Sequence, residues 1–259
     1  MRNADSKVPI PEGAQLGLAQ LFDTDTAEFY ALLKGWIQVC DKEHVQCRRT
    51  DETSTMPTRL IEVGKQLRLV ETADIEPSRY AALSHCWGKL EPHQKFCTYK
   101  NNFTHRKEGI DFEALPRTFR DAITVTRRLC VEYIWIDSLC IVQDDKTDWE
   151  SEASKMEQVF SAAFFTIGAS SAESSLQGFL ANRKPRTVLK VPSNTSGMMY
   201  ACLDTDNFHN DVELSPLNSR GWVLQERALS RRTMFFTSKQ VYWECGGGIH
   251  CETLTRLKK

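Results

Sequence analysis

The chain has 259 residues, of which 41% are apolar, and this suits one large or two small globular domains. Its 33 basic and 34 acidic residues leave a net charge of −1. Because the basic residues do not cluster, we expect no nucleic-acid partner. No run approaches the roughly 20 consecutive apolar residues that a membrane span requires, so we expect no membrane-spanning segment.

The first 76 residues predict an N-terminal extension that braces the main domain. The polar start, residues 1–15, does not resemble a secretory signal and predicts a loose arm in a cytoplasmic protein. Residues 16–45 have helical spacing, and residues 58–71 hold two alternating runs typical of a hairpin. We expect the main domain to occupy residues 77–259.

The main domain is predicted to begin with a strand over residues 80–86, which ends before Gly88. Residues 89–115 form a long polar connection, and such a length predicts a functional loop or a mobile lid. Pro116 then opens a helix whose apolar residues recur at three- and four-residue spacing.

Residues 133–167 predict a strand, a helix and a second, parallel strand. The first strand ends at Asp137, and a loop with Asp144 and Asp145 follows. Ligands of open α/β sheets bind outside the carboxyl ends of the strands, so we expect the functional site beside Asp137. For Asp144 and Asp145 the alternative is that they are solvated acids before a helix capped by Asp148.

The last third predicts an insertion around residues 171–219, followed by a short helix over residues 220–229 and two strands. Within the insertion, residues 188–191 and 198–203 predict a separate hairpin. Together the elements predict an α/β fold with a flavodoxin-like, mostly parallel sheet of about five strands flanked by helices.

Glu226 lies on the apolar face of the predicted helix, close in helical spacing to Trp222 and Leu229. A carboxylate held there is partly withdrawn from water, so its pKa should rise unless a cation compensates. The alternative is a structural ion pair with a neighbouring arginine. The candidates are Arg220, Arg227 and Arg231.

Cysteine and histidine suggest two other kinds of site. A cysteine protease would pair Cys86 or Cys140 with a histidine. His85 should point to the opposite strand face from Cys86, which leaves His93 or His105 of the long connection as the alternative partner. The candidate zinc ligands are Cys40, His44 and Cys47 with Cys245, His250 or Cys251. Their spacing lacks the paired Cys-x2-Cys pattern, so we predict no metal site and no metal requirement, and leave zinc binding by Cys40, His44 and Cys47 open.

The chain contains YAALSHCWG (80–88), LPRTFRDAITVTRRLCVEYIWIDSLCIVQDDKTDWESEASKM (115–156) and RGWVLQERALSRR (220–232). These segments resemble the HET (heterokaryon incompatibility) domain of filamentous fungi, which more often has Tyr in place of His85. The segment GWIQVCDKEHVQC (35–47) resembles the lead-in often found before that domain. The resemblance implies a cytosolic trigger of regulated cell death after fusion of genetically unlike cells. It also implies a nucleotide-binding receptor domain or an incompatible allelic partner.

HET domains are distantly similar to TIR domains, which have a flavodoxin-like fold and several of which cleave NAD. Those enzymes need a glutamate in a W-x-x-x-E context, and Trp222 and Glu226 have that spacing. The resemblance implies that Glu226 is catalytic and that NAD is the substrate. The implied NAD-binding residues are Ser84, Trp87, Gly88, Asp137, Asp144, Asp145 and Trp222.

These observations predict an NAD glycohydrolase (NAD+ nucleosidase) of fungal allorecognition and innate immunity that becomes active as a homo-oligomer. One alternative is a non-enzymatic scaffold that signals cell death through homotypic contacts. Another is an inactive fragment whose C-terminal partner supplies the function.

Overall fold

The computed structural model describes residues 18, 21–48, 56–64, 66–180, 183, 187–193, 197–202, 206–254 and 256–257. Within these ranges it describes the backbone but not the side chains of residues 191–193, 197–200, 222 and 256–257. The predicted arm at residues 1–15 lies outside the described residues.

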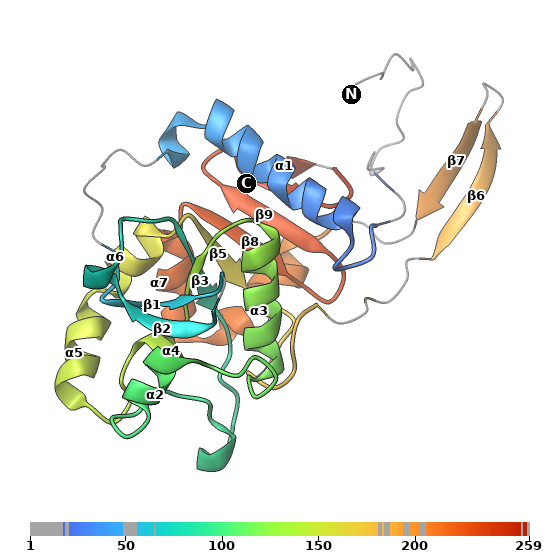
Figure 1. Cartoon of the computed structure of the whole chain (residues 1–259). Coiled ribbons are helices and arrows are strands. Elements are labelled where there is room, and N and C mark those ends of the chain that lie inside the picture. The colour runs from blue at the N-terminus through green and yellow to red at the C-terminus, as the bar shows by residue number, and fades with distance from the viewer. Residues whose placement is uncertain are drawn as a thin grey trace.

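Among the described residues, nine strands form one sheet in the order β11-β10-β9-β8-β5-β3-β4-β1-β2 (Figure 1). The strands are β1 (Arg59–Glu62), β2 (Arg68–Glu71), β3 (Tyr80–Ser84), β4 (Tyr133–Trp135), β5 (Phe165–Gly168), β8 (Arg232–Phe236), β9 (Val241–Cys245), β10 (Gly248–Cys251) and β11 (Arg256–Leu257). The α-helices are α1 (Ala27–Glu43), α2 (Phe103–Glu108), α3 (Arg117–Arg128), α4 (Asp137–Cys140), α5 (Lys146–Ser154), α6 (Met156–Ala162) and α7 (Gly221–Leu229). Shorter helical turns are η1 (Val45–Cys47), η2 (Thr72–Asp74), η3 (Pro92–Gln94), η4 (His209–Glu213) and η5 (Leu217–Ser219).

The centre of the sheet is parallel. Strand β3 pairs in parallel with β4 on one side and β5 on the other, and β5 pairs in parallel with β8. Every residue of β3, β5 and β8 is buried, which explains why their sequences are mostly apolar and do not alternate clearly. The parallel centre with its flanking helices confirms the predicted α/β class.

Antiparallel strands extend the sheet on both sides, so the prediction of about five strands was wrong. The hairpin predicted as a brace, β1 and β2, joins the edge of the main sheet because Ile61 of β1 pairs with Ile134 of β4. On the other side β9 pairs with β8, and the unpredicted strands β10 and β11 follow. The predicted domain division at residues 76 and 77 therefore falls between strands of one sheet.

Helices cover both faces of the sheet. Helix α1 crosses β8 and β9 (Figure 1), where Phe29 lies 6.4 Å from Phe236 and Trp36 lies 6.5 Å from Trp243 between ring centroids. Helix α3 adjoins α1, because its Arg128 lies 5.7 Å from the ring of Tyr30. Helices α6 and α7 contact each other. The crossover from β3 through α3 to β4 and the crossover from β4 through α6 to β5 run in opposite directions across the sheet, which places these helices on opposite faces.

The predicted helix after the acidic loop is two helices, α5 and α6, which meet at Lys155. Asp145 caps α5, since its carboxylate accepts hydrogen bonds from the amides of Thr147 (3.1 Å) and Asp148 (3.3 Å). The expectation that Asp148 is the cap was therefore wrong. Asp148 lies in the first turn of α5, where its carboxylate forms an ion pair with a buried cation.

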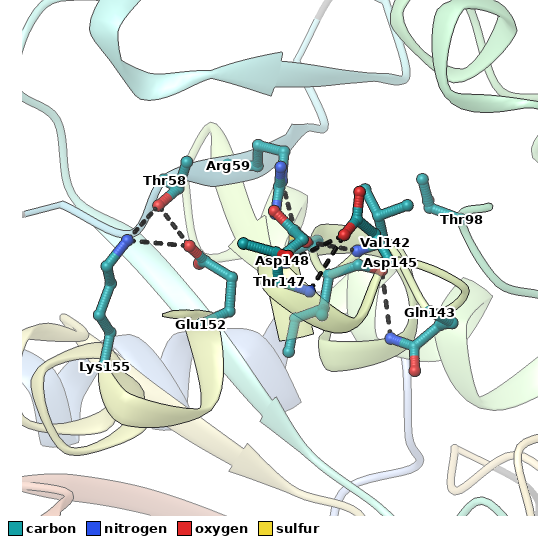
Figure 2. A network of polar contacts seen from close by, with 12 residues as sticks. Thr58, Arg59, Thr98, Val142, Gln143, Asp145, Thr147, Asp148, Glu152 and Lys155 are labelled. Carbon is teal, nitrogen blue, oxygen red and sulfur yellow. Dashed lines mark hydrogen bonds and ion pairs between the residues drawn. The ribbon is translucent and has the colours of Figure 1, made fainter. Parts of the chain in front are cut away.

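That cation is Arg59 of β1, whose side chain is 8% exposed. Its Nη2 lies 2.7 and 2.6 Å from the two carboxylate oxygens of Asp148, and its Nε donates to the Cys140 carbonyl at 2.7 Å. Figure 2 shows this contact beside a second one, in which Glu152 accepts hydrogen bonds from Thr58 and Lys155. The network binds α5 to the start of β1.

The long connection over residues 89–115 contains η3 and α2 and lies against β2, where the Ile110 amide donates to the Leu67 carbonyl at 2.7 Å. The predicted inserted hairpin is confirmed as a separate antiparallel pair, β6 (Val188–Ser193) and β7 (Gly197–Cys202). Of the helices in the described part of the chain, none has the length and apolar character needed to cross a membrane.

Candidate active site

The end of β3 lies where the chain reverses its direction across the sheet. Numbered along the chain, the four parallel strands have the order 2-1-3-4: the chain runs from β3 to β4 on one side and then returns to β5 on the other side of β3. Such a switch point leaves an opening for ligands at the carboxyl ends of the strands. Ser84, at the end of β3, pairs with Gly168 of β5 at this edge.

Helix α7 places Glu226 against this strand end. The hydroxyl of Ser84 donates a hydrogen bond to Oε2 of Glu226, and Glu226 is only 8% exposed. On the same helix, Val223 packs with Cys86 and Leu217 in a small apolar cluster. The helix therefore carries the glutamate inward; of the two predicted apolar neighbours, Leu229 packs against the main core, and the side chain of Trp222 lies outside the described residues.

Burial raises the pKa of Glu226 from 4.5 to about 7. The negative charge of Asp137 adds to the rise, while the hydrogen bond from Ser84 and the charge of Arg220 oppose it. The predicted rise in the pKa is confirmed.

Neighbouring arginines make other contacts than the predicted structural ion pair. Arg227 binds Glu244 at 2.8 Å and Glu213 at 3.3 Å. Arg220 donates a hydrogen bond from Nη1 to the carbonyl of His85. Arg220 thus contributes positive charge near Glu226 while its guanidinium holds the turn after β3.

Asp137, at the start of α4, lies beside the same turn. Its carboxylate accepts hydrogen bonds from the Trp87 indole Nε1–H and the Ser138 amide, each at 2.7 Å. Its Oδ1 also lies 3.9 Å from Nδ1 of His85. The predicted residues Ser84, Trp87, Asp137 and Glu226 therefore gather at one edge of the sheet.

His85 also belongs to this group, although its place there was not predicted. Its ring is 1% exposed and lies edge-on against Phe119, with 5.1 Å between centroids. Burial lowers the pKa of His85. The positive charge of Arg220 lowers that pKa further, whereas the negative charge of Asp137 raises it, and the neutral imidazole is favoured. Neither ring nitrogen has a hydrogen-bond partner among the described residues. In the sequence, the one indication of this role is that a polar residue follows directly after an apolar strand.

Gly88 lies very close to the backbone of residues 173–174. Its φ is +81°, and a Cβ added there would lie 2.4 Å from Cβ of Ser174. The glycine allows the turn after β3 to pack against residues 173–174. Its predicted contact with a ligand stays a prediction.

Asp144 and Asp145 contact the connection after β3 instead of Glu226. The amide of Lys100 donates to Asp144 at 2.8 Å, and the Lys100 ammonium lies 3.0 Å from Asp145. These contacts and the cap of α5 suit the structural alternative. The side chain of Trp222 lies outside the described residues.

The cysteine protease alternative lacks an activated thiol. Cys86 packs with Val223 of α7, whereas His85 packs against Phe119 of α3, so the two side chains diverge as predicted. Burial raises the pKa of Cys86, and it raises the pKa of Cys140 to about 12. Both thiols therefore stay protonated at neutral pH.

A hollow of about 560 Å³ lies at the other edge of the parallel strands. Its lining includes Arg79, Tyr133 and Phe164, which stand just before or at the start of β3, β4 and β5. Ligands of such sheets bind at the carboxyl edge, and the converging polar groups lie there too. We therefore place the candidate site around Glu226.

The family model for heterokaryon incompatibility protein (HET) matches residues 80–226, more than half of the chain. The matched segment begins at β3 and ends at Glu226 itself. No curated protein and no solved structure matches the chain.

Proposed function

Because this chain belongs to the heterokaryon incompatibility (HET) family, we propose that it triggers cell death in the cytoplasm as an NAD glycohydrolase with Glu226 as its catalytic carboxylate. The observation that carries the proposal is the buried Glu226 carboxylate, held by Ser84 at the switch point of a parallel sheet. The strand order 2-1-3-4 is that of the first four strands of a flavodoxin-like sheet, which supports the proposed relation to TIR domains.

Cleavage of the nicotinamide–ribose bond suits one carboxylate. The bond breaks with its electron pair on nicotinamide, which leaves as a neutral molecule and needs no general acid. The ribose becomes oxocarbenium-like, as in glycoside cleavage. Ionised Glu226 stabilises that positive charge from a site shielded from water, and a water molecule then adds to the ribose carbon and releases a proton.

The pKa of Glu226 sets when this carboxylate is available. With a pKa of about 7, a large part of the glutamate is ionised at neutral pH. Ser84 favours the ionised form through its hydrogen bond, and Asp137 opposes it through its charge. The two residues therefore tune the carboxylate in opposite directions.

The site is closed in this conformation. Glu226, Ser84 and His85 are 8%, 5% and 1% exposed, so a dinucleotide reaches the carboxylate only after α7 or the turn after β3 moves. Such closure supports an enzyme that is silent in the single chain and opens on self-association.

A non-enzymatic scaffold is the second candidate, and one observation favours it. Leu224, on the same helix as Glu226, is 74% exposed and offers an apolar contact to another molecule. In that case signalling depends on the outer face of α7, and the buried Glu226 serves only packing.

Cell killing by expressed variants separates the two candidates. We expect Glu226→Gln to abolish killing while self-association persists, because Gln keeps the shape but not the charge. Glu213→Gln is the matched control, since Glu213 is near but exposed to solvent. Killing that survives Glu226→Gln and disappears in Leu224→Glu would establish the scaffold.

A further inference from the structure

Four metal-binding side chains from two distant parts of the chain meet at one end of α1. Cys40 lies in the last turn of α1, His44 follows that helix, Cys47 lies in η1, and Cys245 ends β9. Their ligand atoms all lie within 4.8 Å of one another. Figure 1 shows how this arises, because α1 lies across β9.

We propose that Cys40, His44, Cys47 and Cys245 bind a structural zinc ion. Three thiolates and one imidazole form a donor set typical of closed, four-coordinate zinc sites. Ligands at roughly 2.0–2.3 Å from a shared ion are separated from one another by less than about 4 Å. The 3.3 Å between Nδ1 of His44 and Sγ of Cys245 meets that requirement.

The turn between β9 and β10 is shaped around these ligands. The amide of Gly246 donates to Sγ of Cys47 at 3.2 Å, and the amide of Gly247 donates to Sγ of Cys245 at 3.3 Å. Such bonds to sulfur orient the ligands and stabilise thiolates. A Cβ on Gly247 would lie 2.1–2.5 Å from the His44 ring, so only glycine lets the ring take this position.

A buried cation also suits the charge of the proposed site. Zinc with three thiolates and a neutral imidazole has a net negative charge. Arg232, which is 5% exposed, reaches the same loop, with hydrogen bonds to the Cys47 carbonyl at 3.2 Å and to Asp41 at 2.5 Å. Its positive charge therefore lies beside the cluster.

The site would link the end of α1 to the end of β9. His44 and Cys245 are 201 residues apart in sequence. Helix α1 already packs on β8 and β9 through aromatic contacts, and a shared zinc ion would add a second link. Of the alternative ligands, Cys251 instead contacts Asp206 and Thr253. The proposal revises the prediction of no metal site, and it does not depend on the proposed NAD chemistry.

Metal analysis of the purified chain tests the proposal. We expect about one zinc per chain. Cobalt(II), exchanged for zinc, should show thiolate charge transfer and the intense visible bands of a tetrahedral site. Cys40→Ser and Cys245→Ser should lose the metal, whereas Cys140→Ser should keep it, because Cys140 is equally buried but lies elsewhere.

A glycine pair keeps the test decisive should the cysteine variants fail to fold. Gly247→Ala retains all four ligands but displaces His44, so zinc affinity should fall roughly 10- to 100-fold. Gly35→Ala, on α1 with open space around it, should bind zinc as the wild type does. A zinc-supplied wild type with free thiols but no metal, or equal metal loss in Cys140→Ser and Cys40→Ser, would overturn the proposal.

Discussion

The hydroxyl of Ser84 donates a hydrogen bond to the carboxylate of Glu226, which lies 142 residues further along the chain. This bond joins the end of the central strand to α7, the last element before β8. It also opposes the effect of burial on the glutamate, because a donor to the ionised carboxylate favours that form. The bond is therefore both a structural link and an adjustment of the proposed catalytic group.

Removal of the hydroxyl in Ser84→Ala should raise the pKa of Glu226 above about 7. We expect NAD cleavage at neutral pH to fall by roughly three- to tenfold and to recover at higher pH. A pH profile of nicotinamide release measures this. Ser170→Ala is the control, since Ser170 is also buried but its hydroxyl has no partner among the described residues. An unchanged profile in Ser84→Ala would contradict this role.

Asp137→Asn should shift the same profile in the opposite direction. The negative charge of Asp137 raises the pKa of Glu226, so its loss lowers that pKa and moves the rising limb of activity to lower pH. The Asn carbonyl can still accept the bond from Trp87. Asp144→Asn, which contacts Lys100 instead, should leave the profile in place. A shift to higher pH in Asp137→Asn would refute the electrostatic account.

Glu226→Gln should change the pH dependence of folding. Because the pKa of Glu226 is raised from 4.5 to about 7, the folded state binds more protons between these values, and the free energy of unfolding falls as pH rises. Gln does not titrate, so the mutant should gain roughly 3 kcal/mol relative to wild type between about pH 4 and about pH 8. Urea titrations measure this difference.

Glu213→Gln gives the control with the opposite sign. The hydrogen bond from His209 lowers the pKa of Glu213, so the wild type gains stability as pH rises and the mutant does not. The same direction of change in both mutants would show that the pH dependence does not report on Glu226.

Loss of the buried ion pair between β1 and α5 should be costly. Asp148→Ala leaves Arg59 buried without its carboxylate, and we expect the free energy of unfolding to fall by about 3–5 kcal/mol. Glu150→Ala, on the same helix, removes an exposed contact with Lys146 and should cost about 1 kcal/mol or less. Chemical denaturation compares the two, and equal losses would contradict the assigned role of Arg59.

Apolar patterning predicted the parallel centre and its main helices. Runs buried on both faces marked β3, β4 and β5, and helical spacing marked α3 and α7. The hairpin of β1 and β2 and the strand β9 were predicted as elements, but their place in the main sheet was not, because strand pairing is decided by tertiary contact. Nothing local indicates that Ile61 will lie beside Ile134, or that two more strands will follow Gly247.

The part of the site that follows from strand order and helix spacing was predictable from the sequence. The expectation that side chains following the central strands converge placed Ser84 and Asp137 together, and the helix face placed Glu226 inward. The roles of His85 and Arg220 depend on the turn after β3, which spacing does not reveal. Likewise, Cys245 meets Cys40 only because α1 crosses β9.

The central claim is that Glu226 cleaves NAD, and nicotinamide release tests it most directly. Purified wild type and Glu226→Gln should be compared at high concentration or with a crowding agent, which promotes assembly. We predict release by the wild type and a loss of at least about a hundredfold in an equally folded mutant. If both proteins assemble and neither cleaves NAD, or if the mutant cleaves it as fast as the wild type, the claim is wrong.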